Sequence, residues 1–132
     1  MKSLVTAAVL FLSVILLISV NSFILNDLIE YTEKNLGLIP ETLKELENIS
    51  TEQKEKISAS LENIEKKWNK KETFLCLSLK HNVSREFTGQ LIPAKSYFDS
   101  EEYPEFLALI LSAKDTLKHI SYDEGFKIGN IL

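Results

Sequence analysis

Charged residues are absent from a stretch near the start of the chain and frequent after it. Ser3 to Asn26 carries no Asp, Glu, Lys or Arg, and most of its residues are apolar. A helix over Leu4–Leu25 would be about 33 Å long, enough to cross a hydrocarbon core of roughly 30 Å. Backbone in lipid must satisfy its own hydrogen bonds, which favours a helix. We therefore predict a transmembrane anchor over residues 1–25.

A cleaved signal peptide is the alternative interpretation of the same segment. The apolar region of a signal peptide is usually about 7–15 residues long, whereas Leu4–Val20 is longer. A cleavage site after Ser22 nonetheless fits the preference for small residues there. We favour the retained anchor, which would tether the rest of the chain, whereas cleavage would release it.

The charges that flank the apolar segment predict its orientation. Lys2 and the amino terminus precede it, whereas Asp27, Glu30 and Glu33 follow it. Positive charge flanking a span favours the cytoplasmic side. We expect a single-pass protein of the cell membrane, with its N-terminus in the cytoplasm and its C-terminal domain outside.

Beyond the anchor, apolar positions step by three and four residues. The series consists of Leu25, Ile29, Thr32, Leu36, Ile39, Leu43 and Leu46. A heptad-like stripe with one polar member predicts that the anchor helix runs on into a helical stalk over residues 26–49. Pro40 disfavours helix at the preceding residue, so we expect a kink or restart there. The interaction stripe that we expect to contact a second copy or a multi-spanning membrane protein comprises Ile29, Leu36, Ile39, Leu43 and Leu46.

Three further amphipathic segments follow, each with one apolar stripe. Their stripes are Ile57, Leu61, Ile64, Trp68, Leu75 and Leu79; Val83, Phe87, Leu91, Ala94 and Phe98; and Tyr103, Phe106 or Leu107, Ile110, Ala113, Leu117 and Ile120. Two capping boxes mark the starts of the first and last of these segments, one formed by Ser50 with Gln53 and one by Asp99 with Glu102. Short connections make successive helices antiparallel. The pattern predicts an all-α fold, with an antiparallel up-down helical bundle over residues 50–132 whose three helices are closed or extended by the stalk.

Composition agrees with a helical domain and excludes some partners. Gly and Pro are scarce, at four and three residues, which is untypical of sandwiches and barrels. The 15 basic and 19 acidic residues give a net charge of −4. Binding to nucleic acid and broad adhesion to anionic lipid headgroups both require a basic surface, so we expect neither. The single cysteine, Cys76, cannot form an internal disulfide.

Candidate chemistry is sparse. His81 and His119 are the two histidines, and the antiparallel layout places both at one end of the bundle. With Asp123 they form a candidate metal site, although both also fit the ends of helices, where a cation is favourable. No glycine-rich phosphate loop, nucleophile elbow or zinc motif is present. We expect no catalytic residue and no cofactor.

The leading hypothesis is a non-enzymatic, membrane-anchored accessory protein whose helical domain binds a membrane or envelope partner. The alternative is an extracytoplasmic helical bundle that senses a ligand or a metal and acts through a partner, since bundles hold ligands between their helices.

The order of these features resembles a known family. A Lys-led apolar span is followed by LENIEKKWNKKETFLCLSLKHN, LIPAKSYFDSEEYPEFLALILSAKDTLKHI and a closing GNIL. The landmarks are Trp68, His81, Lys95-Ser96-Tyr97, Lys118-His119-Ile120 and Asn130-Ile131-Leu132. Over essentially its whole length the chain resembles domain-of-unknown-function family 4363, short membrane-anchored helical proteins of anaerobic spore-forming bacteria. The resemblance implies a membrane-tethered setting and no known activity; Gly89, Pro93 and Pro40 depart from the uninterrupted helices that it implies.

Overall fold

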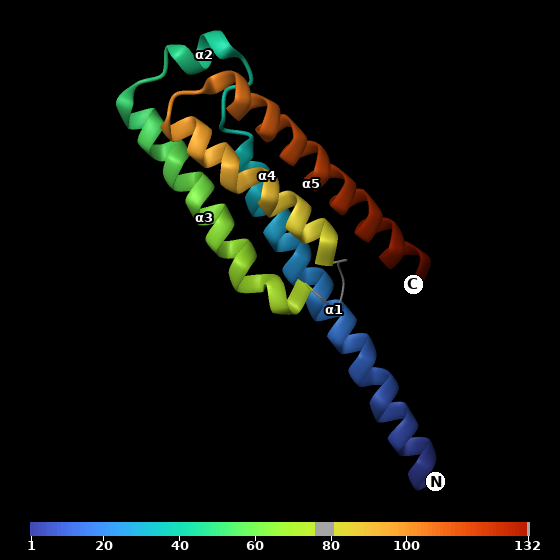
Figure 1. Cartoon of the computed structure of the whole chain (residues 1–132). Helices are drawn as coiled ribbons and strands as arrows, with labels where there is room; N and C mark the ends of the chain where they lie inside the picture. Colours follow the sequence, from blue (N-terminus) through green and yellow to red (C-terminus); the bar gives the residue numbers. More distant parts are fainter. Residues whose placement is uncertain (76–80, 132) are drawn as a thin grey trace.

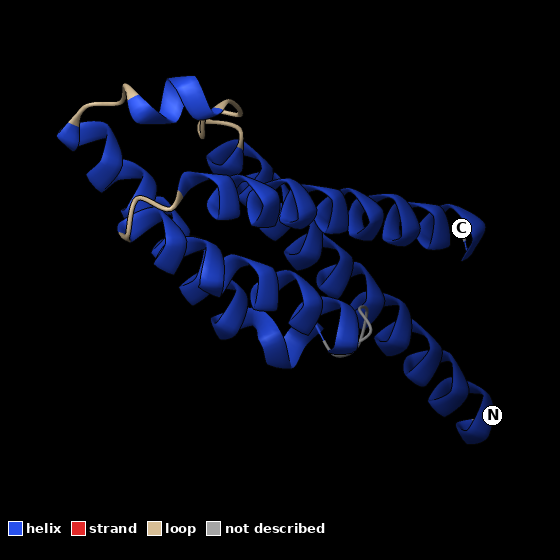
Figure 2. Cartoon of the chain, turned by 45° about the horizontal axis from the view of Figure 1, so that its top comes forward, coloured by secondary structure: helices blue, strands red, loops and turns tan. Residues whose placement is uncertain are grey.

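The computed structural model contains five helices in the described part of the chain and no strand there (Figure 2). It describes the backbone of residues 1–75 and 81–131, and the side chains of residues 1–72 and 83–120. The helices are α1 (Lys2–Leu36), α2 (Leu43–Glu47), α3 (Thr51–Leu75), α4 (His81–Asp99) and α5 (Tyr103–Ile131). The all-α prediction is therefore confirmed.

The four long helices form an up-down bundle. α1 packs against α3 and α5, α3 packs against α4, and α4 packs against α5, which closes the ring. Successive long helices run antiparallel, and α2 lies across one end of the bundle against α5 (Figure 1). At the opposite end α1 extends well beyond the other helices. We call the end capped by α2 the distal end and the end where α1 leaves the bundle the proximal end.

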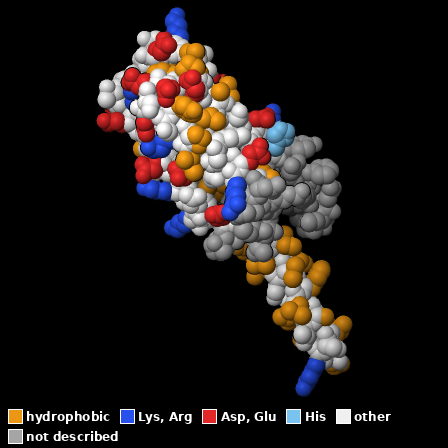
Figure 3. Space-filling model, in the orientation of Figure 1, with side chains coloured by type: hydrophobic (Ala, Val, Ile, Leu, Met, Phe, Trp, Pro, Cys, Tyr) orange, Lys and Arg blue, Asp and Glu red, His pale blue; other side chains and the backbone are white. Residues whose placement is uncertain are grey.

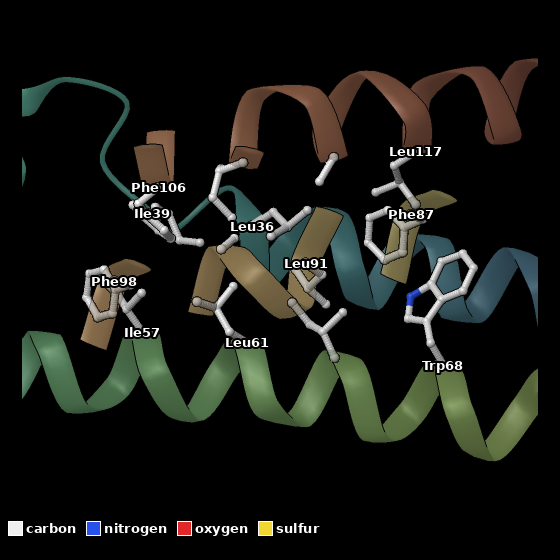
Figure 4. Close-up of a cluster of buried hydrophobic side chains, with 14 of the residues drawn as sticks. Leu36, Ile39, Ile57, Leu61, Trp68, Phe87, Leu91, Phe98, Phe106 and Leu117 are labelled. Carbon is white, nitrogen blue, oxygen red and sulfur yellow. The ribbon is translucent and has the colours of Figure 1, made fainter. Parts of the chain in front are cut away.

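The core is built from the stripes that the sequence predicts. Its largest fully buried side chains include Trp68, Phe87 and Phe106, which come from α3, α4 and α5 (Figure 4). Trp68 stacks against Phe87 with ring centroids 4.5 Å apart, and Phe98 lies 4.9 Å from Phe106. Aromatic pairs at such distances stabilise a core beyond the area that they bury.

Local sequence signals explain how two of the helices begin. The Ser50 hydroxyl accepts from the Gln53 backbone N–H at 3.2 Å, and the Gln53 side chain accepts from the Ser50 N–H at 3.0 Å. This reciprocal pair is the predicted capping box at the start of α3. The Thr42 hydroxyl caps α2 by accepting from the Glu45 N–H at 3.3 Å.

The second predicted capping box is wrong. Asp99 is the last residue of α4 and accepts hydrogen bonds from Ser58 and Lys95, each at 2.9 Å. The turn into α5 instead contains Glu101 with φ 60°, and the following N–H donates back to the Tyr97 carbonyl at 2.8 Å. This left-handed turn closes α4 in the way glycine usually does.

The prolines leave the long helices largely intact. Pro40 lies in the turn after α1, so it does not interrupt that helix, which has already ended at Leu36. Pro93 lies inside α4, and the helix continues through it to Asp99. Proline cannot donate to the carbonyl of Gly89 four residues earlier. Gly89 is exposed, so water can take that donor's place.

Candidate functional site

The N-terminal half of α1 projects from the bundle with its apolar side chains uncovered (Figure 3). Every residue from 1 to 20 is exposed, including Leu4 at 75% and Phe11 at 67%. The helix is long and apolar enough to cross a membrane, a property that signal sequences share. Residues 3–20 alone span about 27 Å along the helix axis, close to the thickness of a hydrocarbon core.

Three hydroxyl groups inside this apolar segment donate hydrogen bonds to the backbone of the helix itself. Thr6, Ser13 and Ser19 each donate to the carbonyl oxygen four residues earlier, at 2.8, 2.8 and 2.9 Å. In water these bonds would compete with solvent, but in lipid no other partner is at hand. The polar atoms of the segment are therefore compatible with an apolar surrounding.

The transition from the projecting segment to the bundle takes place within about one turn of α1. Val20 is 49% exposed, whereas Asn21 is 5% exposed and Leu25 is 1% exposed. The Asn21 side-chain oxygen is buried and has no hydrogen-bond partner in the described part of the chain. The same continuous helix thus passes from an uncovered apolar surface directly into the bundle core.

Polar contacts hold the inner half of α1 against α3. The Trp68 indole N–H donates to the Thr32 hydroxyl at 2.9 Å, and that hydroxyl donates to the Leu28 carbonyl at 2.7 Å. Thr32 is fully buried. The one polar member of the predicted stripe is therefore the hydrogen-bond partner of the single tryptophan.

Lys67 adds a second connection between these helices on the surface. Its ammonium lies 3.8 Å from the centroid of the Tyr31 ring and 3.8 Å from the Asp27 carboxylate. A cation over an aromatic ring is attracted by the negative face of the ring. Both contacts fix the register in which α3 runs back along α1.

Most of the predicted interaction stripe is buried against other helices of the same chain. Ile29, Leu36, Ile39 and Leu46 are at most 4% exposed and belong to the bundle core, whereas Leu43 is 41% exposed. The stalk expected over residues 26–49 is the inner half of α1, a turn and α2, packed on α3 and α5, so it closes the bundle rather than extending from it. These four side chains cannot contact a partner while the bundle is folded, because helices of the same chain cover them.

A groove lies at the distal end, where three segments meet. One recess of about 260 Å³ is lined by Leu38, Pro40, Ile49, Gln53, Lys56 and Ile57. A wider recess of about 580 Å³ is lined by Pro40, Lys44, Glu45, Asn48, Ile49 and Gln53. Because the two share Pro40, Ile49 and Gln53, we treat them as one distal groove. Leu38 at its edge is 71% exposed.

Ion pairs bind the remaining parts of the distal end together. The Lys54 ammonium donates to Glu101 at 2.7 Å, and Lys114 donates to Glu41 at 2.9 Å. Each bond lowers the pKa of its glutamate. Burial raises the pKa of Asp99, but hydrogen bonds from Lys95 and Ser58 outweigh it, so this pKa lies below its usual value.

These lowered pKa values predict how the stability of the fold depends on pH. A carboxylate with a lowered folded-state pKa stabilises the fold above its unfolded-state pKa, near 4, and this contribution is lost as the pH falls through the lower value. We expect the urea midpoint to be level from pH 7 to about pH 5 and to fall below about pH 4. Asp99→Asn should reduce the fall.

Glu105→Gln is the matched control for this experiment, because Glu105 is exposed and forms no ion pair in the described part of the chain. Urea denaturation followed by circular dichroism at each pH measures the effect. An equal acid response in wild type and Asp99→Asn would contradict the role assigned to this carboxylate.

The candidate metal ligands are not brought together within the described side chains. His119 is exposed, and its Nε2 lies 3.5 Å from Asp115 on the same helix. The side chains of His81 and Asp123, and the whole of Cys76, lie outside the described residues. No group of three or more His, Cys, Asp or Glu side chains gathers among the described residues. Metal or ligand sensing stays a prediction, tested by thermal-shift screening with metals and small metabolites.

The sequence reasoning missed the distal groove. Leu38 falls between two stripe positions, Leu36 and Ile39, so it cannot share their buried face. An apolar side chain outside the buried stripe was the one sequence feature that pointed to an exposed apolar surface here. The rest of the groove depends on how the turn after α1 meets the start of α3, which the periodicity does not specify.

Comparison with known families agrees with the sequence landmarks. The model of the family described as "Domain of unknown function (DUF4363)" matches residues 19–131, which include the inner half of α1 and the other helices. No curated protein and no solved structure matches the chain. The resemblance inferred from Trp68 and the later landmarks is confirmed, and the chain belongs to the DUF4363 family.

Proposed function

We propose that this protein is a single-pass, membrane-anchored interaction protein without enzymatic activity. The observation that carries the proposal is the change of surroundings along α1. Its first 20 residues expose an apolar surface, and its inner half is core. Soluble monomers rarely expose a continuous apolar surface of this extent, whereas a lipid bilayer covers it.

The flanking charges support an orientation with the bundle outside the cytoplasm. Lys2 precedes the apolar segment, and the first charges after it are those of Asp27 and Glu30. The bias of positive charge toward the cytoplasmic side places the N-terminus inside. Because α1 passes into the core without a linker, the bundle would lie directly against the membrane surface.

The distal groove is the surface that we propose for a protein partner. It lies at the end of the bundle that points away from the anchor (Figure 1). Exposed Leu38 and the side chains of Pro40 and Ile49 offer an apolar centre, and Lys44 and Glu45 lie at its edge. An apolar centre with a charged rim is typical of protein interfaces. The occupant that fits is one apolar side chain, or two, of a partner protein.

Affinity purification of the full chain from gently solubilised membranes tests this proposal. The wild type should recover a partner in stoichiometric amount, and Leu38→Ser should lose at least about 1 kcal/mol of binding, or fivefold or more in recovery. Leu111→Ser is the matched control, because Leu111 is a similarly exposed leucine, at 50%, on α5. A strictly monomeric wild type without a partner, or undiminished recovery with Leu38→Ser, would overturn the proposal.

A further inference from the structure

A group of lysines lies on the part of α3 that is closest to the membrane anchor. It comprises Lys66, Lys67, Lys70 and Lys71, which we call the α3 lysine cluster. Lys66 and Lys70 are exposed, and Lys67 and Lys71 are half-buried. The contacts of Lys67 with Asp27 and Tyr31 set the position of the cluster relative to α1.

The antiparallel register brings the end of this cluster close to the projecting segment. Lys67 and Trp68 lie level with Asp27 to Thr32. Lys70 and Lys71 are one turn further toward the proximal end, only about 5–10 Å along α1 from the level where the uncovered apolar surface ends. That distance is comparable with the Debye length of roughly 8 Å at physiological salt.

Two members of the cluster have no anionic partner among the described side chains. Lys66 pairs with Glu62 at 3.0 Å and Lys67 with Asp27 at 3.8 Å. Lys70 and Lys71 form no ion pair in the described part of the chain. The dipole of α3 does not account for them, since no basic residue lies in its last turn.

The net charge of −4 conceals an uneven distribution. Acidic side chains gather over the distal end, whereas basic and acidic side chains lie together along the lower flank above the projecting segment (Figure 3). The distal acidic residues are Glu41, Glu45, Glu47, Glu52, Glu55, Glu101, Glu102 and Glu105. At the proximal end the α3 lysine cluster lies among acidic residues that include Asp27 and Glu65, so this surface carries both charges.

We propose that Lys70 and Lys71, supported by Lys66 and Lys67, bind anionic phospholipid headgroups beside the anchor. This inference rests on the membrane anchor of the proposed function. Basic residues within a Debye length of a leaflet that contains anionic lipid are attracted by the negative surface potential of that leaflet. The contact would fix the tilt and rotation of the bundle on the membrane, with the distal groove facing away from it.

Amine labelling of the full chain in lipid nanodiscs tests the inference. One set of discs contains phosphatidylcholine alone, and the other contains phosphatidylcholine mixed with phosphatidylglycerol. Lys70 and Lys71 should be labelled roughly fivefold more slowly in the anionic discs. Lys34, exposed near the distal end of α1, is the internal control and should be labelled equally in both. High salt should remove the protection, because it screens the attraction.

Two variants provide a second readout. Purified wild type and Lys34→Gln should retain phosphatidylglycerol from mixed membranes, whereas Lys70→Gln/Lys71→Gln should retain severalfold less. Equal labelling in the two kinds of disc, or equal lipid retention, would overturn the inference. Protection in native membranes but not in anionic discs would also overturn it and would indicate an acidic protein partner. A chain that enters neither kind of disc would overturn the anchor itself.

Discussion

Replacing Trp68 with alanine is expected to lower the free energy of unfolding of the bundle by about 3–5 kcal/mol. Trp68 is 1% exposed and stacks on Phe87, so its removal leaves a cavity between α1, α3 and α4. It also leaves the buried Thr32 hydroxyl without the indole donor. Small domains are stable by only 5–15 kcal/mol, so this variant is expected to be largely unfolded at moderate denaturant concentration.

Urea denaturation followed by far-ultraviolet circular dichroism measures this effect. Trp68→Phe keeps an aromatic ring beside Phe87 but loses the hydrogen bond, and should cost about 1–2 kcal/mol. Asn69→Ala, at the exposed neighbouring position, should leave stability nearly unchanged. If Trp68→Ala were no less stable than Asn69→Ala, the packing described for α1 and α3 would be incorrect.

Placing two arginines in the projecting segment is expected to remove the protein from the membrane fraction. Leu12 and Leu16 are 64% and 66% exposed near the middle of that segment. An arginine at the centre of a span costs about 2.5–3.5 kcal/mol on insertion scales, so Leu12→Arg/Leu16→Arg should cost roughly 5–7 kcal/mol. Helix formation itself should be little affected, because arginine is a good helix former.

Cell fractionation followed by immunodetection checks this prediction. Leu111→Arg introduces the same charge at an exposed leucine of the bundle and should leave the protein in the membrane fraction. Finding the wild type in the soluble fraction, or the double-arginine variant in membranes in undiminished amount, would contradict an anchoring role for residues 3–20.

Features that depend on neighbouring residues were predictable from the sequence. The apolar stripes of α3, α4 and α5 identify the core because a helix repeats every 3.6 residues. The Ser50–Gln53 capping box was predicted correctly, because both of its hydrogen bonds lie within one turn. The Asp99–Glu102 pair has the same local pattern, yet the Asp99 carboxylate accepts hydrogen bonds from Ser58 on α3 and from Lys95 instead of capping α5.

Features that depend on which helix covers which face were not predictable. The stripe of Ile29 and Leu36 was identified, but the pattern left open whether it would close the bundle, as it does against α3 and α5, or contact another protein. An apolar stripe indicates burial and does not say which surface buries it. Thr32 appeared only as a defect in that stripe, because its partner Trp68 lies far along the chain.

The candidate surfaces were also hidden from the sequence for physical reasons. The distal groove forms only when the turn containing Leu38 and Pro40 meets Ile49 and the start of α3. The α3 lysine cluster is visible in the sequence, but the net charge averages it with the acidic residues of the whole chain. Its position beside the projecting apolar segment follows only from the register that Lys67 and Trp68 establish with α1.

The most direct measurement is the intact mass, with the N-terminal sequence, of the chain recovered from cell membranes after an alkaline wash. The wash removes peripheral proteins. A helix that is both anchor and core predicts a chain that resists the wash and still contains residues 1–25. Recovery of a shorter chain that begins at Phe23 and is free outside the membrane would contradict it.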